Sequence, residues 1–248
     1  MTLPEALLLF LAGFGSGAAN AIAGGGTFLT FGAMTLVGLP PIVANATSSI
    51  TQFPGYVTSA LAYRVEIRRD GVTAAKLAVI SALGGLLGAV ILLSLSNPSF
   101  RAMVPWLLLA ATAIFAAGPW LKPRPRGAHA PVGPLGLVAQ FVTAIYGGFF
   151  GAGMGIMMLA VLGLATGSDY HRLNAIKNFL AMVIAGVAIL VFAGGNVVGW
   201  PQALVMIPGG ALGGWSGVWL ARRVPQAVIR ALVVAIGLAL TGYYFTTG

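Results

Sequence analysis

Long runs of apolar residues, separated by short stretches rich in glycine, proline and charge, recur along the whole chain. With those stretches as boundaries, the pattern predicts ten helical segments in two sets of five. They are 4–23, 27–37, 42–63, 72–95 and 100–120, then 132–151, 155–165, 172–193, 201–221 and 227–245. Most have the roughly 20 residues that a helix needs to cross the hydrocarbon layer. The pattern therefore predicts an all-α polytopic membrane protein.

The second segment of each set is short. Segments 27–37 and 155–165 have only about 11 residues, too few to cross a bilayer alone. We expect each to form a broken or re-entrant hairpin with the segment before it, so that each set contains one hairpin and three spanning helices. The expected division is a first repeat at 1–121, a cytoplasmic linker at 122–131 and a second repeat at 132–248.

Composition agrees with a membrane environment. Only 7% of the residues are charged and 58% are hydrophobic, whereas about a quarter are charged in a typical soluble domain. The net charge of +9 comes from short clusters between apolar segments, not from a basic face, so we expect a lipid bilayer and no nucleic acid as partner. The chain has no cysteine and two histidines far apart in sequence, so we expect no metal and no cofactor.

Basic clusters at 64–69, 122–126 and 222–223 are expected on the cytoplasmic side, where Lys and Arg concentrate. An even number of crossings separates successive clusters, which is consistent with this placement. Both termini are then periplasmic or external, and the expected location is a bacterial inner membrane.

The two sets of segments look like a duplication. A constant offset of 129 residues aligns matching residues over some 80 positions, which include Gly24 with Gly153, Gly26 with Gly155, Asn45 with Asn174 and Gly84-Gly85 with Gly213-Gly214. The basic loop 64–70 is expected inside, whereas its counterpart 193–199 is uncharged and expected outside. The repeats are therefore predicted to be inverted, as in many secondary transporters, whose broken helices form a binding site near the midplane.

Glycine-rich breaks precede both short segments. Gly24, Gly25 and Gly26 lead into Thr27, and Gly153 and Gly155 lie in the second break. Consecutive glycines disfavour helix and would let the first N–H groups of the short helix face an anion. The alternative is tight helix packing by small residues, which is our interpretation of the glycines at 84–88 and 213–217.

Polar residues flank the first break and open the helix after it: Asn20, Asn45, Thr47, Ser48 and Gln52. Their hydroxyls and amides could bind an oxyanion without adding charge. Hydrogen bonds between helices, or back to the carbonyls of their own helix, are an equal alternative.

The corresponding helix of the second half carries Asn174, Lys177 and Asn178. A charge inside the membrane is costly and by default suggests function, so we expect Lys177 to attract the anion. The alternative is that its side chain extends to the nearby interface. The four carboxylates of the chain lie at segment ends or in loops, which disfavours a cation pathway and a membrane enzyme.

The residues Gly24-Gly-Gly-Thr27, followed by Gly38-Leu-Pro-Pro-Ile-Val-Ala-Asn-Ala-Thr-Ser48, resemble the signature of the TauE/SafE sulfite exporter family, also called TSUP transporters. The resemblance covers nearly the whole chain. It implies an inner-membrane carrier for sulfite or for small organosulfur anions, sulfonates or carboxylates. It also implies that the two glycine-bearing hairpins and the helices after them enclose the substrate.

These observations together predict a secondary transporter that moves a small anion across the inner membrane by alternating access, and not an enzyme. Two alternatives remain open: an anion channel, and a non-transporting membrane subunit that supports a partner. The direction of transport, the coupling ion and homo-oligomer formation are also left open.

Overall fold

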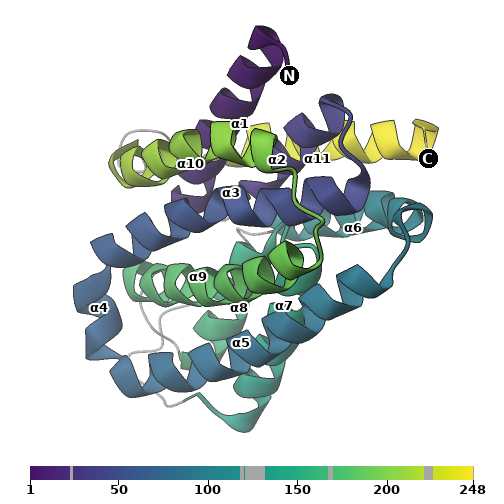
Figure 1. Cartoon of the computed structure of the whole chain (residues 1–248). Helices are drawn as coiled ribbons and strands as arrows, with labels where there is room; N and C mark the ends of the chain where they lie inside the picture. Colours follow the sequence, from purple (N-terminus) through teal and green to yellow (C-terminus); the bar gives the residue numbers. More distant parts are fainter. Residues whose placement is uncertain (23–24, 118–119, 121–131, 167–169, 221–225, 248) are drawn as a thin grey trace.

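The computed structural model describes residues 1–22, 25–117, 120, 132–166, 170–220 and 226–247. Within these residues the chain is helical and contains no strand (Figure 1). The helices are α1 (Leu3–Ile22), α2 (Thr27–Leu36), α3 (Pro41–Ala62), α4 (Arg64–Arg69), α5 (Gly71–Ser94), α6 (Asn97–Ala117), α7 (Pro134–Phe149), α8 (Met154–Thr166), α9 (Tyr170–Gly194), α10 (Trp200–Leu220) and α11 (Gln226–Thr247). Every predicted segment corresponds to a helix whose ends lie within three residues of those expected. The all-α prediction is confirmed.

Both expected hairpins are present. Helix α2 has 10 residues and α8 has 13, and each packs against the helix before it, α1 and α7 respectively. Gly151 and Gly153 both have φ of 76°, a left-handed conformation that glycine adopts without steric cost, so α7 ends there and the chain turns into α8. The glycines thus break the helices as the sequence pattern predicts.

Helices of the two halves pack against each other in equivalent pairs. α1 packs along α10 and α7 packs along α5, while α3 and α9 lie against each other across the middle of the molecule (Figure 1). α6 and α11 form a further pair. Exchanging the halves therefore reproduces the contacts, as a two-fold relation between them would. Contacts alone do not orient this relation in a bilayer, so inversion of the repeats stays a prediction.

Glycine allows the closest of these helix contacts. A β-carbon added at Gly213 would overlap the carbonyl oxygen of Phe14, and one added at Gly88 would overlap that of Ile145. The first pair joins α10 to α1 and the second joins α5 to α7. These glycines therefore serve tight helix packing, which is the interpretation that we favoured for them.

Large apolar side chains cover the outside of the helix assembly. Examples are Leu7 on α1, Val79 on α5, Trp106 on α6, Leu204 on α10 and Trp215 on α10, all exposed. Within the described residues, α5, α6 and residues 172–194 of α9 are long and apolar enough to cross a membrane. Polar side chains of α1 and α3 are meanwhile buried. Apolar residues outside and polar residues inside are what lipid surroundings favour, and the protein is a multi-pass membrane protein.

The basic stretch at 64–69 is helical, although we expected a loop. It forms the short helix α4, in which no side chain is buried. Asp70 follows it and is 7% exposed. Its carboxylate accepts two hydrogen bonds from the guanidinium of Arg172, near the start of α9. This bidentate ion pair joins the two halves and was not predicted.

The linker 122–131 and the basic clusters at 122–126 and 222–223 lie outside the described residues.

Replacing Asp70 by Asn should lower the free energy of unfolding by about 1–3 kcal/mol, between the values for an exposed and a buried pair, because Arg172 would lose this carboxylate. Thermal unfolding of the detergent-purified protein measures the change. Glu66→Gln makes the same chemical change on α4 and should have little effect. Asp70→Asn combined with Arg172→Gln should be less damaging than Asp70→Asn alone. Equal stability of Asp70→Asn and Glu66→Gln would contradict this role.

Candidate functional site

The side chain of Asn20 stabilises the first break. Asn20 lies in the last turn of α1, and its Oδ1 accepts a hydrogen bond of 2.8 Å from the backbone N–H of Gly26. That N–H, which we expected to face an anion, is therefore bound by the protein itself. A β-carbon at Gly26 would overlap the carbonyl oxygen of Ser16 and lie 2.6 Å from Asn20 Nδ2. Only glycine fits where the chain leaves α1 and enters α2.

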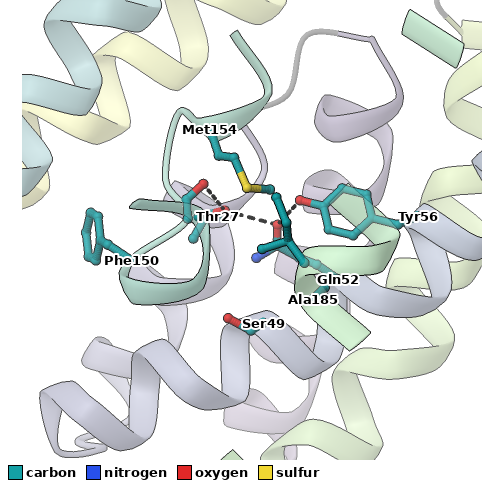
Figure 2. Close-up of a pocket in the computed structure, with 10 residues that line it drawn as sticks. Thr27, Ser49, Gln52, Tyr56, Phe150, Met154 and Ala185 are labelled. Atoms are coloured by element: carbon teal, nitrogen blue, oxygen red, sulfur yellow. Dashed lines mark hydrogen bonds between the residues drawn. The ribbon is translucent and has the colours of Figure 1, made fainter. Parts of the chain in front are cut away.

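Gln52 of α3 is the centre of a buried hydrogen-bond network at this break. Its Oε1 accepts from Asn20 Nδ2 at 2.6 Å, from Thr27 Oγ1 at 3.0 Å and from the hydroxyl of Tyr56 at 3.1 Å. Thr27 and Tyr56 approach it from opposite sides (Figure 2). Its Nε2 donates to the carbonyl of Ser48 at 3.0 Å. The network joins α1, α2 and α3.

A small cavity lies beside this network and between the two halves. It has an empty volume of about 280 Å³, including its open side. The lining residues come from α2, α3, the α7–α8 hairpin and α9: Thr27, Ser49, Gln52, Tyr56, Gly147, Phe150, Gly151, Met154, Ile184 and Ala185. The hydroxyl of Thr27 lies 3.0 Å from Gln52 Oε1 and 3.5 Å from the carbonyl oxygen of Gly151. The two breaks, one from each half, therefore meet at Thr27.

Lys177 is buried beside the first break. Its side chain is 1% exposed, so it does not extend to the surface as the snorkelling alternative requires. Its Nζ donates a hydrogen bond of 3.2 Å to the carbonyl oxygen of Asn20 in the last turn of α1. A cation is favourable at a helix C-terminus, where carbonyl groups lack helical partners. Lys177 does not line the cavity, but Asn20 connects it to Gln52.

The two equivalent asparagines reach across to the opposite half. Asn45 Nδ2 of α3 donates to the carbonyl oxygen of Phe149 at the end of α7, at 2.8 Å. Asn174 Nδ2 of α9 lies 3.4 Å from the carbonyl oxygen of Ala21 at the end of α1, and 3.3 Å from the hydroxyl of Tyr63. Each asparagine thus binds a carbonyl oxygen in the last turn of the first hairpin helix of the other half. Their position is explained by helix capping across the repeat interface.

Other expected site residues lie apart from the cavity lining. Thr47 Oγ1 accepts from the N–H of Gly199, and Ser48 Oγ lies 3.8 Å from the sulfur of Met34. Gly25 packs near Phe115 and Val233. Gly153 and Gly155 lie at the start of α8, where the Gly153 carbonyl accepts from two following N–H groups. Gly24 lies outside the described residues.

Asn178, next to Lys177, has an unusual environment. Its side chain is fully buried, and neither its Oδ1 nor its Nδ2 has a hydrogen-bond partner among the described residues. A buried amide without partners costs about 1–3 kcal/mol per polar group, so such a position needs an explanation. A water molecule or a polar ligand atom beside Asn178 would provide one.

Of the ten residues that line the cavity, sequence reasoning placed only Thr27 and Gln52 in the candidate site. Three of the others contribute polar groups. Tyr56 lies four residues after Gln52, on the same face of α3, and this helical spacing could have identified it. Ser49 lies in the polar stretch that opens α3 but was not singled out. Gly151, the first residue of the second break, was not expected to face the site; it has a left-handed conformation, and its carbonyl oxygen lies 3.5 Å from Thr27 Oγ1.

The profile of the family described as "Sulfite exporter TauE/SafE" matches residues 9–244. The chain belongs to this family. The family membership that the first glycine motif suggested is thereby confirmed, and the match covers nearly the whole chain.

Three relatives are similar to this chain over almost their full length. A protein of Haemophilus influenzae named "Probable membrane transporter protein" is 28% identical, with 94% of this chain and 92% of the relative covered. "Probable membrane transporter protein ORF9" of Sinorhizobium sp is 31% identical, covering 94% and 89%. "Probable membrane transporter protein YfcA" of Escherichia coli K12 is 27% identical, covering 94% and 87%. The curated relatives are thus named as membrane transporters.

Gly26→Ala should destabilise the protein by about 3 kcal/mol, the upper end of the usual cost of overpacking, because the new methyl group would collide with α1 backbone. Gly242→Ala in α11 is the matched control, because a β-carbon there meets no atom within 4 Å. It should be neutral or stabilising by up to about 1 kcal/mol. Thermal unfolding in detergent tests both, and equal stabilities would show that the break tolerates a side chain.

Proposed function

We propose that this protein is a secondary transporter that moves a small anion across the inner membrane by alternating access. Sulfite, or a related organosulfur, sulfonate or carboxylate anion, is the proposed substrate. The observation that carries the proposal is the meeting of the two helix breaks at Thr27, beside a cavity that residues of both halves line. Broken helices that meet between two repeats form the substrate sites of many secondary transporters.

The chemistry of the cavity favours an anion. Its polar groups include the hydroxyls of Thr27, Ser49 and Tyr56, and no charged side chain is among its described lining residues. Lys177 lies behind this wall and contacts it through Asn20. A buried ammonium group behind the wall makes the local potential positive without forming an ion pair with the substrate. A cation would instead need carboxylates in the path.

The size of the cavity favours a compact substrate. Its empty space of about 280 Å³ already includes the open side, so the cavity leaves room only for a small ligand. One wall is polar and comes from α3, whereas Ile184 and Ala185 of α9 form an apolar wall. A small organosulfur anion has a matching shape, with its oxygens on one side and its carbon on the other.

The repeated helix packing supports alternating access. α3 of one half and α9 of the other lie against each other, and the equivalent pairs α1–α10 and α7–α5 flank them. With a two-fold relation of this kind, one half can move against the other. The protein then has two conformations, in which the two halves exchange their arrangements. We place both termini outside and the basic clusters in the cytoplasm, which makes the repeats inverted. Export of a monoanion from a negative interior would then gain about 2.3 kcal/mol per 100 mV.

The decisive experiment is counterflow in proteoliposomes that contain only this protein. Vesicles loaded with unlabelled sulfite are diluted into labelled sulfite, and parallel samples use sulfoacetate and a short carboxylate. We expect saturable accumulation of at least one labelled anion. An anion channel would instead give conductance without substrate-driven exchange. A subunit that only supports a partner would move none of the three anions, which would refute the proposal.

Lys177→Met should lower counterflow at least about tenfold, the equivalent of about 1.4 kcal/mol, because the buried positive charge behind the cavity is lost. Lys76→Met is the matched control, since it removes the same charge from an exposed position of α5. It should transport as the natural protein does. Normal transport by a folded Lys177→Met protein would exclude this role for the lysine.

A further inference from the structure

Three hydrogen-bond donors converge on a single oxygen at the first break. The amide of Asn20, the hydroxyl of Thr27 and the hydroxyl of Tyr56 all lie 2.6–3.1 Å from Oε1 of Gln52. A neutral amide oxygen has two lone pairs, so it accommodates two donors readily and a third less well. Three donors around one point are better matched to an anionic oxygen, which accepts stronger hydrogen bonds.

Neighbouring backbone groups determine which way these amides face. Gln52 Nε2 lies 3.0 Å from the carbonyl oxygen of Ser48, which can only accept, so the oxygen of Gln52 must face the other side. Asn20 Oδ1 accepts from the N–H of Gly26, so its amide nitrogen must face Gln52. Thr27 Oγ1 has only acceptors beside it, Gln52 Oε1 and the Gly151 carbonyl oxygen. Because the oxygen of Gln52 faces them, Asn20, Thr27 and Tyr56 all donate to it.

We propose that Oε1 of Gln52 occupies the position of one oxygen of the transported oxyanion, and that the substrate binds to Asn20, Thr27 and Tyr56 by displacing this side chain. The inference rests on the proposed function and adds the atoms that recognise the substrate. Gln52 is then an internal competitor of the substrate, and Tyr56 is a residue that determines specificity.

The surroundings of Gln52 allow such an exchange. Gln52 already lines the cavity, so its side chain and the substrate can trade places within one connected space. One of its two Nε2 contacts, to Thr30 Oγ1, is long at 3.4 Å. Donor distances of 2.6–3.1 Å are those of hydrogen bonds to oxygen, whereas the larger chloride ion would need the donors farther apart. The site should therefore prefer an oxyanion to a halide.

Gln52→Met separates a competitor from an ordinary binding residue. Methionine keeps the length of the side chain but presents no strong acceptor to the three donors. The probe is the rise in unfolding temperature of the detergent-purified protein in sodium sulfite, compared with sodium chloride at equal ionic strength. We expect this rise to be at least as large in Gln52→Met as in the natural protein. Loss of the rise in a folded Gln52→Met protein would overturn the inference.

Gln52→Glu tests the donor cluster without any ligand. A carboxylate at this position would receive the three donors, but its second oxygen would lose the hydrogen bond to the Ser48 carbonyl, so the variant should be less destabilised than the control. Gln140→Glu is the matched control, because Gln140 is fully buried in α7 and its Oε1 has no partner among the described residues. That variant should be clearly destabilised. Equal destabilisation of the two variants would overturn the inference.

Tyr56→Phe removes one donor and should raise the half-saturating sulfite concentration in counterflow about tenfold, as the loss of a hydrogen bond to a charged acceptor does. Tyr244→Phe removes a buried hydroxyl that bonds Thr35 instead, and should leave this value unchanged. An unchanged value in Tyr56→Phe, with normal transport by the natural protein, would refute the inference but leave the transporter function standing. Absence of transport by the natural protein would refute the function, and the comparison of Gln52→Glu with Gln140→Glu would still decide the donor cluster.

Discussion

The structure depends on pairing backbone polar groups inside an apolar environment. An unpaired amide or carbonyl in hydrocarbon costs several kcal/mol, and this chain interrupts two of its helices between other helices. Asn20 binds the N–H of Gly26 on one side of the first break. Lys177 and Asn174 bind carbonyls in the last turn of α1, and Asn45 binds one in the last turn of α7. Polar side chains are therefore concentrated at the two breaks.

This requirement links stability to the proposed function. The side chains that pair the broken backbone come mainly from the opposite half, as the reciprocal contacts of Asn45 and Asn174 demonstrate. Movement of one half against the other would change these contacts together with the cavity between them. Lys177 has both roles in our account, because it caps α1 and supplies positive charge near Gln52 through Asn20.

The candidate site was predicted in part. The motif residues Asn20, Thr27 and Gln52 do meet, because the break places the start of α2 next to α3. Thr47 and Ser48 belong to the same polar stretch, yet they face Gly199 and Met34. Successive helical residues differ by about 100° in direction, so neighbours in one motif face different surroundings.

The sequence by itself determined the apolar helices, their breaks and the membrane environment, because apolar length and glycine act locally. Only the tertiary structure decided which polar groups meet. Tyr56 reaches Gln52 within one helix, but Thr27 lies against Gly151 of the second half, and Asp70 pairs with Arg172 more than 100 residues away. Contacts between distant segments depend on how each helix is rotated and tilted against its neighbours. That depends on packing across the whole molecule, which no local pattern specifies.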